Sequence, residues 1–322
     1  MFVDAHFHPG LKGFTPEKIT EYLDREKIDQ IWLFSWEELN PPIPELYRHI
    51  SVEEILEAYH HNPDRIVPFY APDPTQSDVC DRLTRYAEKG IKGYGELKVT
   101  ARWSDPEITK MLECLRKQRF PIVFHNELSR YHYMPNSKSY FDRQFGKLMN
   151  GAFNGVSRLY IDQFVNATGL FRKKINRKLK YFPGYMLDMA EFEQQLQAFP
   201  DVTFIAHGPL FWKAIASDYS PVLKNDKGKI REKGVSVRLL EEYDNLYADI
   251  SGNSGFNALN RDHEFTKWFL EHLPHKLLYG TDNYLLGQKE LINAFELSED
   301  KKKLILGDNA YQILYQEKET DQ

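Results

Sequence analysis

The stretch that decides the fold is FVDAHFH, residues 2–8. Its first part, Phe2–Ala5, is a short apolar run that predicts a buried strand. Seven similar runs follow, each bounded by polar residues, glycine or proline: Ile31–Ser35, Ile66–Ala71, Ile91–Val99, Pro121–His125, Val202–His207, Leu246–Ile250 and Leu277–Gly280. Short, nearly continuous apolar runs are typical of parallel strands that are buried on both faces.

Amphipathic stretches with helix-start signals separate these runs. Thr15-Pro16-Glu17 combines an N-cap residue with proline at the first helical position, and Ser51 and Glu54 form a capping-box pattern. Eight strands that alternate with helices leave two architectures, a closed (β/α)8 barrel and an open doubly wound sheet. No GxGxxG or GxxxxGK[ST] motif follows a strand, so the sequence favours the α/β class with a (β/α)8 TIM barrel.

The composition narrows the class of protein further. The 322 residues are 42% hydrophobic and 28% charged, with a net charge of −5. We expect a single domain over residues 1–322, because α/β barrels reach about this size as one domain. Interspersed charges and short apolar runs argue against a nucleic-acid or membrane partner. The two cysteines, Cys80 and Cys114, supply neither a disulfide framework nor a CxxC metal pair, which favours a reduced, cytoplasmic protein.

One interval is out of scale with a barrel unit, since about eighty residues separate His125 from the strand at Val202. Residues 126–185 are rich in aromatic and basic residues, and we expect a helical insertion over the C-terminal face of the barrel. Within it lies a basic run made of Arg172, Lys173, Lys174, Arg177, Lys178 and Lys180. We interpret this run first as a solvated helix face, and second as a surface for an anionic substrate or a partner.

Side chains that can bind metals follow several of the predicted strands. His6 and His8 are two residues apart, so they share a face of the strand. His125, His207 and Asp282 come at or just after the ends of three further strands, and a parallel barrel gathers these ends at one face. A lone histidine on an apolar strand is usually a core residue, but four of 11 histidines at strand ends fit that explanation poorly. Imidazole and carboxylate together favour one or two Zn²⁺ ions, with Mn²⁺, Fe²⁺ or Ni²⁺ as alternatives.

This ordered set of motifs resembles the amidohydrolase superfamily, in particular the "amidohydrolase 2" group that also contains aminocarboxymuconate-semialdehyde-type decarboxylases. The resemblance extends from Asp4 to the closing Leu306-Gly307-Asp308-Asn309-Ala310 and leaves residues 126–185 unexplained. It implies a metal-dependent hydrolase that cleaves a carbonyl-type bond in a lactone, an ester or an amide. Nonoxidative decarboxylation of an unsaturated or aromatic acid on one metal is the alternative. A third interpretation is a non-catalytic metal-binding scaffold.

The strand over Ile91–Val99 is where the subgroups of this superfamily differ. Binuclear members use a carboxylated lysine or a glutamate from this strand to bridge two metals, whereas the decarboxylase-like members use one metal and no bridge. Gly95-Glu96 is similar to the strand-four motif of TatD-type members, in which the glutamate is a ligand. We therefore predict Glu96 as a metal ligand and Lys98 as a contact for a substrate anion. An ion pair between Glu96 and Lys98 beside one metal, and a carboxylated Lys98, are the alternatives.

The remaining roles follow from the chemistry of a bound divalent ion, which lowers the pKa of water from about 15.7 to roughly 7. Asp282 is the expected general base, and His207 is expected to bind the metal and to polarise the scissile carbonyl. Asp4 either orients a ligand imidazole or accepts hydrogen bonds from the backbone. Arg130 and His132 are predicted to contact a small-molecule substrate, and a homodimer is an open alternative. Four further residues are candidates for the site only because they follow predicted strands: Asp249, Ser251, Asn283 and Tyr284.

Overall fold

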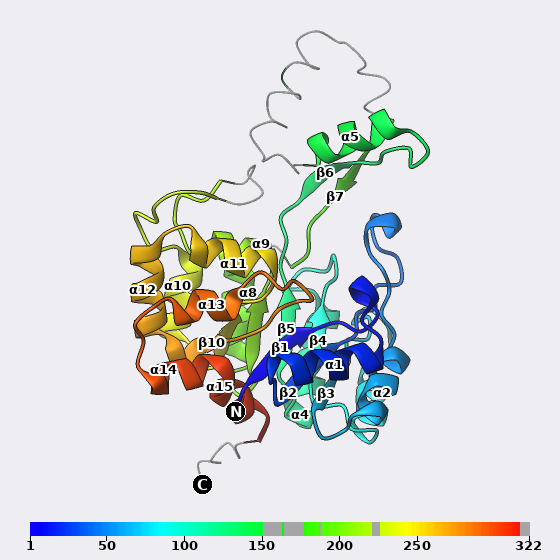
Figure 1. Cartoon of the computed structure of the whole chain (residues 1–322). Coiled ribbons are helices and arrows are strands. Elements are labelled where there is room, and N and C mark those ends of the chain that lie inside the picture. Colours follow the sequence, from blue (N-terminus) through cyan, green and yellow to red (C-terminus); the bar gives the residue numbers. More distant parts are fainter. Residues whose placement is uncertain (151–162, 164–176, 187, 221–225, 316–322) are drawn as a thin grey trace.

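The structure is a computed structural model, and it describes residues 1–150, 163, 177–186, 188–220 and 226–315. Eight parallel strands form the barrel in Figure 1: β1 (Val3–Phe7), β2 (Gln30–Phe34), β3 (Ile66–Phe69), β4 (Tyr94–Leu97), β5 (Ile122–His125), β8 (Phe204–His207), β9 (Leu246–Asp249) and β10 (Leu277–Leu278). Each lies within or overlaps one of the predicted apolar runs. The predicted (β/α)8 barrel is therefore confirmed.

The strands form two parallel sheets that meet at two seams. One sheet has the order β1-β2-β3 and the other the order β10-β9-β8-β5-β4. Between β3 and β4, Tyr70 donates its backbone N–H to Gly93 O at 3.0 Å. Between β10 and β1, Ala5 donates to Tyr279 O at 2.9 Å. These backbone hydrogen bonds close the ring of eight strands.

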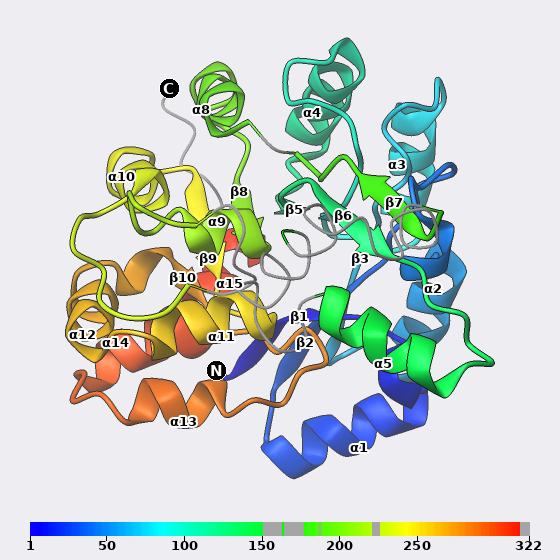
Figure 2. The same ribbon diagram turned by 90° about the horizontal axis from the view of Figure 1, so that it is seen from above.

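Helices surround the ring (Figures 1 and 2): α1 (Pro16–Glu26), α2 (Val52–His61), α3 (Val79–Ala87), α4 (Pro106–Gln118), α8 (Met189–Ala198), α9 (Pro209–Lys213), α10 (Val235–Glu242), α11 (Gly252–Asn260), α12 (His263–His272), α13 (Gln288–Asn293), α14 (Glu299–Lys303) and α15 (Asn309–Tyr315). Both predicted caps are present. Thr15 Oγ1 accepts from the backbone N–H of Lys18, and Ser51 and Glu54 form a reciprocal capping box. Among the helices that the structure describes, none is long and apolar enough to cross a membrane.

Apolar side chains fill the inside of the barrel below its C-terminal end. One buried apolar cluster joins side chains of six strands to Ala310 of α15: Val3, Ala5, Trp32, Phe34, Val67, Phe69, Val123, Ile205, Leu278 and Ala310. Burial of a large apolar side chain contributes about 1.5–3 kcal/mol to folding, so this cluster is a substantial part of the core.

The insertion after β5 contains the expected helix, α5 (Tyr140–Met149), and also an antiparallel ribbon that the sequence pattern did not predict. The ribbon pairs β6 (Arg130–Tyr133) with β7 (Leu179–Phe182). It rises from the C-terminal side of the barrel in Figure 1 and lies on the side of α2 and α3 in Figure 2. In the basic run, Lys178 pairs with Asp142. Residues 172–174 of that run lie outside the described residues.

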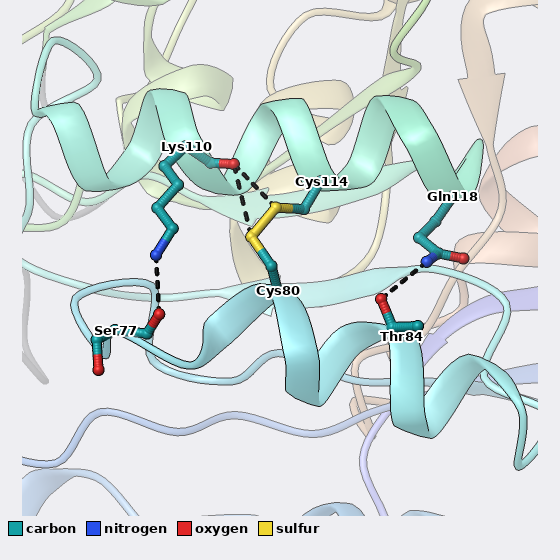
Figure 3. Close-up of a disulfide and its surroundings, with 6 residues drawn as sticks. All are labelled: Ser77, Cys80, Thr84, Lys110, Cys114 and Gln118. Carbon is teal, nitrogen blue, oxygen red and sulfur yellow. Dashed lines mark hydrogen bonds between the residues drawn. A yellow bond between two sulfur atoms is a disulfide. The ribbon is translucent and has the colours of Figure 1, made fainter.

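The expectation of a reduced chain without disulfides is wrong for this structure. Cys80 in α3 and Cys114 in α4 form a disulfide, with their Cα atoms 5.7 Å apart (Figure 3). Beside it, Lys110 Nζ donates to Ser77 O at 2.8 Å. The two cysteines are 34 residues apart in the sequence, so no local pattern indicates that they pair. They meet because consecutive barrel units place α3 and α4 side by side.

Candidate metal centre

Histidines and carboxylates from six strands meet at the C-terminal end of the barrel. His6 lies in β1 and His8 directly after it; Glu96 lies in β4, His125 and His207 end β5 and β8, Asp249 ends β9, and Asp282 follows β10. The pairing of β5 with β8 makes the two terminal histidines direct neighbours. All of these residues except Asp282 are buried. The structure thus brings every predicted ligand to one place.

Asp249 orients two of the histidines at once. Its Oδ2 lies 2.5 Å from His6 Nδ1 and 3.3 Å from His207 Nδ1. Ser251 supports this arrangement, because its backbone N–H donates to Asp249 Oδ1 and its Oγ lies 3.1 Å from His207 Nδ1. With Nδ1 engaged in both rings, the Nε2 atoms of His6 and His207 are left to face the centre of the cluster.

His8 presents the same nitrogen by a different route. Its Nδ1 lies 3.0 Å from Phe34 O, and its Nε2 lies 3.2 Å from His6 Nε2. Two imidazole nitrogens that bind the same Zn²⁺ ion at tetrahedral angles lie about 3.3 Å apart. The spacing of His6 Nε2 and His8 Nε2 therefore suits one shared ion. Asn283 fixes the backbone of His8 through two hydrogen bonds, one accepted from His8 N–H and one donated to His8 O, both at 2.9 Å.

Glu96 lies between the two halves of the cluster. Its Oε1 is 2.8 Å from His125 Nδ1, and its Oε2 is 3.4 Å from His8 Nε2 and 3.7 Å from Lys98 Nζ. Burial would raise the pKa of Glu96, but Lys98 and His125 hold it well below its usual range. Glu96 Oε2 is buried and has no hydrogen-bond partner among the described residues. An ionised oxygen in this situation is suited to a cation.

Asp282 lies at the mouth of the cluster. Its Oδ1 is 3.8 Å from His6 Nε2 and 3.7 Å from His8 Nε2, and its Oδ2 is 4.0 Å from His207 Nε2. The side chain is 22% exposed, against 1% for Glu96. Asp282 therefore faces both the imidazoles and the solvent.

The charges within the cluster are unequal. Burial would raise the pKa of Asp249, but His6 and His207 lower it, so the carboxylate is ionised. Burial would lower the pKa of His207, but Asp249, Glu96 and Asp282 raise it to about 9. The pKa of His6 is lowered by burial and by the neighbouring His207. Without a metal, the extra proton of this pair therefore resides on His207.

Asp4 takes the second of its two predicted roles. Its carboxylate accepts hydrogen bonds from Thr281 N–H at 2.9 Å, Thr281 Oγ1 at 2.7 Å and Tyr22 Oη at 2.9 Å. Burial raises its pKa to about 7, although these hydrogen bonds oppose the shift. The carboxylate that contacts the imidazoles of His6 and His207 is Asp249, whose position at a strand end was the one signal in the sequence.

The predicted substrate contacts lie at different depths. Lys98 Nζ is 4.2 Å from the centre of the Trp36 ring and 5.7 Å from that of Tyr47, next to Glu96. Arg130 lies at the root of the ribbon, where it pairs with Glu127 and lies 3.5 Å from Tyr47 Oη.

His132 lies further out, on β6 of the ribbon. Its Nε2 is 3.1 Å from Asn150 Nδ2, just beyond the end of α5. Figure 1 shows that β6 runs away from the barrel toward α5. Of the three predicted contacts, Lys98 is thus the one that lies directly against the cluster.

The donor set fits a divalent metal. Three compact groups have ligand atoms within 4.8 Å of one another: His6, His8 and Glu96; His6, His207 and Asp249; and Glu96, His125 and His207. Imidazole nitrogens mixed with carboxylate oxygens are the ligands of Zn²⁺ and similar ions. The particular observation that supports the fit is the buried Glu96 Oε2, which accepts no hydrogen bond from the described residues.

A closed (β/α)8 barrel with buried imidazoles and carboxylates at its C-terminal end has the architecture of a metal-dependent barrel enzyme. The family model described as amidohydrolase matches residues 3–315, so the chain belongs to the amidohydrolase family. The members of this family are enzymes that use divalent metals. The resemblance seen in the sequence is confirmed.

Solved structures share this fold at low sequence identity. An uncharacterised TIM-barrel protein from Bordetella bronchiseptica is 13% identical with a TM-score of 0.58, covering 97% of this chain and 98% of that one. A zinc-bound amidohydrolase from Burkholderia multivorans is 9% identical with a TM-score of 0.55, covering 98% and 99%. A probable 2-pyrone-4,6-dicarboxylic acid hydrolase from Acinetobacter baumannii is 12% identical with a TM-score of 0.52, covering 97% and 98%. No curated protein matches this chain.

Proposed function

We propose that the protein is a metal-dependent hydrolase that cleaves a carbonyl-type bond, in a lactone, an ester or an amide, of a small molecule. The observation that carries this proposal is the convergence of three Nε2 atoms and two carboxylates beside a partly exposed aspartate. The fold shared with a probable 2-pyrone-4,6-dicarboxylic acid hydrolase supports the same class of reaction.

His6, His8, Glu96, His125, His207 and Asp282 are the residues that would hold one or two ions, with zinc as the first candidate. A bound divalent ion would supply a Lewis acid for the carbonyl group and a water whose pKa is lowered to about 7. Because Nδ1 of His207 faces Asp249, its Nε2 can serve either as a ligand or as a donor to the carbonyl. We assign it the ligand role.

Asp282 is the proposed general base. It is the most exposed carboxylate of the cluster, at 22% against 1% for Glu96 and 0% for Asp249. Substrate and water can therefore reach it while its Oδ atoms face the imidazoles. It would accept a proton from the attacking water and return this proton to the leaving group.

Lys98 is the proposed contact for an anionic group of the substrate. The ammonium group faces Glu96 on one side and the Trp36 ring on the other, and its side chain is 14% exposed. When a cation engages Glu96, Lys98 loses part of this pairing and can bind a substrate carboxylate. Arg130 and His132 remain predicted contacts for more distant parts of a substrate.

One observation favours the decarboxylase as a second candidate. Lys98 lies 3.7 Å from Glu96 Oε2, the ion pair that was the alternative to a bridging glutamate. A glutamate neutralised in this way would leave a site for one metal. The substrate would then be an unsaturated or aromatic carboxylic acid that loses carbon dioxide.

The test is metal content per chain in protein purified without chelator, followed by assays with lactones, esters and amides. About two equivalents and hydrolysis would support the proposal, whereas about one equivalent and release of carbon dioxide from aromatic acids would support the second candidate. Failure to bind zinc or manganese would contradict both. Asp282→Asn should abolish turnover, and Asp300→Asn, on the exposed surface of α14, is the matched control.

A further inference from the structure

A cavity lies between helices α1 and α13, beside the seam at which β10 meets β1. Its volume is about 290 Å³, and its lining includes Phe2, Tyr22 and Glu26 of α1, Tyr279 after β10, and Lys289 and Glu290 of α13. Figure 2 shows α1 and α13 along the same edge of the barrel. We call this space the seam cavity. It is distinct from the metal centre, because none of the predicted ligands lines it.

Aromatic rings form part of the wall of the seam cavity. The rings of Phe2 and Tyr279 are in contact, with their centres 5.0 Å apart. Tyr22 donates its hydroxyl to the buried Asp4 at 2.9 Å, so its ring rather than its hydroxyl is available to a ligand. The faces of aromatic rings attract cations. Lys289 already uses this attraction, since its Nζ lies 4.2 Å from the centre of the Phe2 ring.

Tyr279 supplies the seam cavity with a polar group that has no partner. The residue is 6% exposed, and its hydroxyl forms no hydrogen bond with any residue that the structure describes. Burial raises the pKa of this hydroxyl, and the negative charges of Asp4, Glu290 and Glu26 raise it further. The hydroxyl is therefore neutral at physiological pH and keeps lone pairs that can accept a hydrogen bond from a ligand.

The seam cavity carries a net negative charge. Among the described residues that line it, two carboxylates, Glu26 and Glu290, face one cation, Lys289. Glu26 pairs with the neighbouring Arg25, whereas Glu290 forms no ion pair with any residue in the described part of the chain. A ligand with a positive charge can therefore pair with Glu290 and donate to the Tyr279 hydroxyl at the same end of the cavity.

We propose that the seam cavity binds a small organic ammonium ion, a primary ammonium group attached to an aromatic or other apolar body. The ammonium group pairs with Glu290 and donates to Tyr279 Oη, while the body packs on the rings of Phe2 and Tyr279. A volume of about 290 Å³ is at the lower end of the range of small-molecule sites, which suits a ligand of this size. The site requires neither the metal nor the proposed hydrolase activity.

The direct test is titration of the whole protein with phenethylammonium, followed by the NMR signals of the probe. Two analogues of similar size are titrated in parallel: 2-phenylethanol, which is neutral, and phenylacetate, which is an anion. Phenethylammonium is expected to bind at least about fivefold more tightly than either analogue. Equal binding of 2-phenylethanol, tighter binding of phenylacetate, or no binding of phenethylammonium up to about 10 mM would each overturn the inference.

A matched set of variants places the probe in the seam cavity. Glu290→Gln and Tyr279→Phe each remove one partner of the ammonium group and should weaken its binding about threefold. Lys289→Met removes the competing cation and should strengthen binding about twofold. Glu299→Gln, on the exposed surface of α14, is the control and should leave the affinity unchanged.

Three outcomes of the variant series would contradict the inference. Unchanged affinity in both Glu290→Gln and Tyr279→Phe would show that the probe binds elsewhere. Weaker binding in Lys289→Met would show that the seam cavity recognises an anion. Loss of binding in Asp282→Asn would place the probe in the metal cluster. None of these results changes the metal content or the turnover of the native protein, so the proposed function is tested separately.

Discussion

The two sides of the metal cluster are supported by different parts of the chain. On the side of β1, β8 and β9, the barrel itself supplies Asp249, whose single oxygen orients His6 and His207. On the side of β4 and β5, the carboxylate that faces the outer nitrogen of His125 is Glu127, at the root of the insertion. We refer to these as the Asp249 side and the Glu127 side.

The difference shows where such a site tolerates variation. The Asp249 side is built from buried strand ends, so a change there alters the surroundings of two predicted ligands together. The Glu127 side depends on the root of an insertion that rises from the barrel, and its carboxylate contacts one predicted ligand, His125.

The largest effect is expected from the disulfide, which braces the helices that follow β3 and β4, on the Glu127 side. Replacing Cys80 and Cys114 by serine should lower the free energy of unfolding by about 4 kcal/mol, the chain-entropy value for a loop of 34 residues. Denaturant unfolding of native and variant protein measures this loss. Zinc affinity should stay unchanged, because neither cysteine contacts the cluster. A fall in affinity would show that the disulfide also shapes the metal site.

Asp249→Asn should weaken the metal centre more than any change on the Glu127 side. The amide has one acceptor oxygen instead of two, so it cannot serve both imidazoles and Ser251 N–H together. If each imidazole that loses its orienting oxygen lowers zinc affinity about tenfold, the two together should lower it at least about 100-fold. Competition with a chromogenic chelator measures it. A fall in zinc affinity of less than about tenfold would contradict the role of Asp249 in holding both imidazoles.

The Asp249 side should also release a proton when metal binds. The pKa of His207 is raised to about 9, so it is charged below that pH and must lose a proton to become a ligand, whereas the lowered pKa of His6 leaves it neutral. Below pH 9, apparent zinc affinity should thus rise about tenfold per pH unit from this group. Calorimetry in buffers of different ionisation enthalpy should show about one proton released at pH 7.5. Binding without proton release would contradict the assignment.

The smallest effect is expected within the insertion. Hydrogen bonds from Lys178, Asn136 N–H and Tyr133 lower the pKa of Asp142 from 3.8 to about 2. Because the folded pKa is depressed, this stabilisation is present above pH 3.8 and is lost as the pH falls through about 2. At pH 7, Asp142→Asn should reduce hydrogen-exchange protection in β6 and β7 about fivefold, or about 1 kcal/mol. Equal exchange in native and variant protein would show that Asp142 does not hold α5 to the ribbon.

Most of the barrel could be predicted because its signal is local. Each buried parallel strand is a continuous apolar run, and parallel strands bring their C-terminal ends together, so His6, His125 and His207 could be placed in one site from their positions alone. The predicted ligand set follows from the same rule. The capping signals at Thr15 and Ser51 were equally local and are present in the structure.

The features that could not be predicted depend on contacts between distant segments. The strands of the ribbon are four residues each and are far apart in the chain, without a tight turn between them. The pairing of Cys80 with Cys114 depends on how α3 packs against α4. Asp249 and Glu127 each face an outer nitrogen of a histidine ring, and the orientation of a ring cannot be read from a sequence.

The seam between β1 and β10 has a consequence for biosynthesis. There the backbone N–H of Ala5 donates to Tyr279 O, and that of Asp282 donates to His6 O at 2.8 Å. The donors on either side of this seam come from β1 and from the segment after β10, which are far apart in the sequence, so a ribosome must translate as far as Asp282 before the predicted ligand set is complete. Metal capture would then mark the end of folding, and a nascent chain that ends earlier would lack the ion that stabilises the finished barrel.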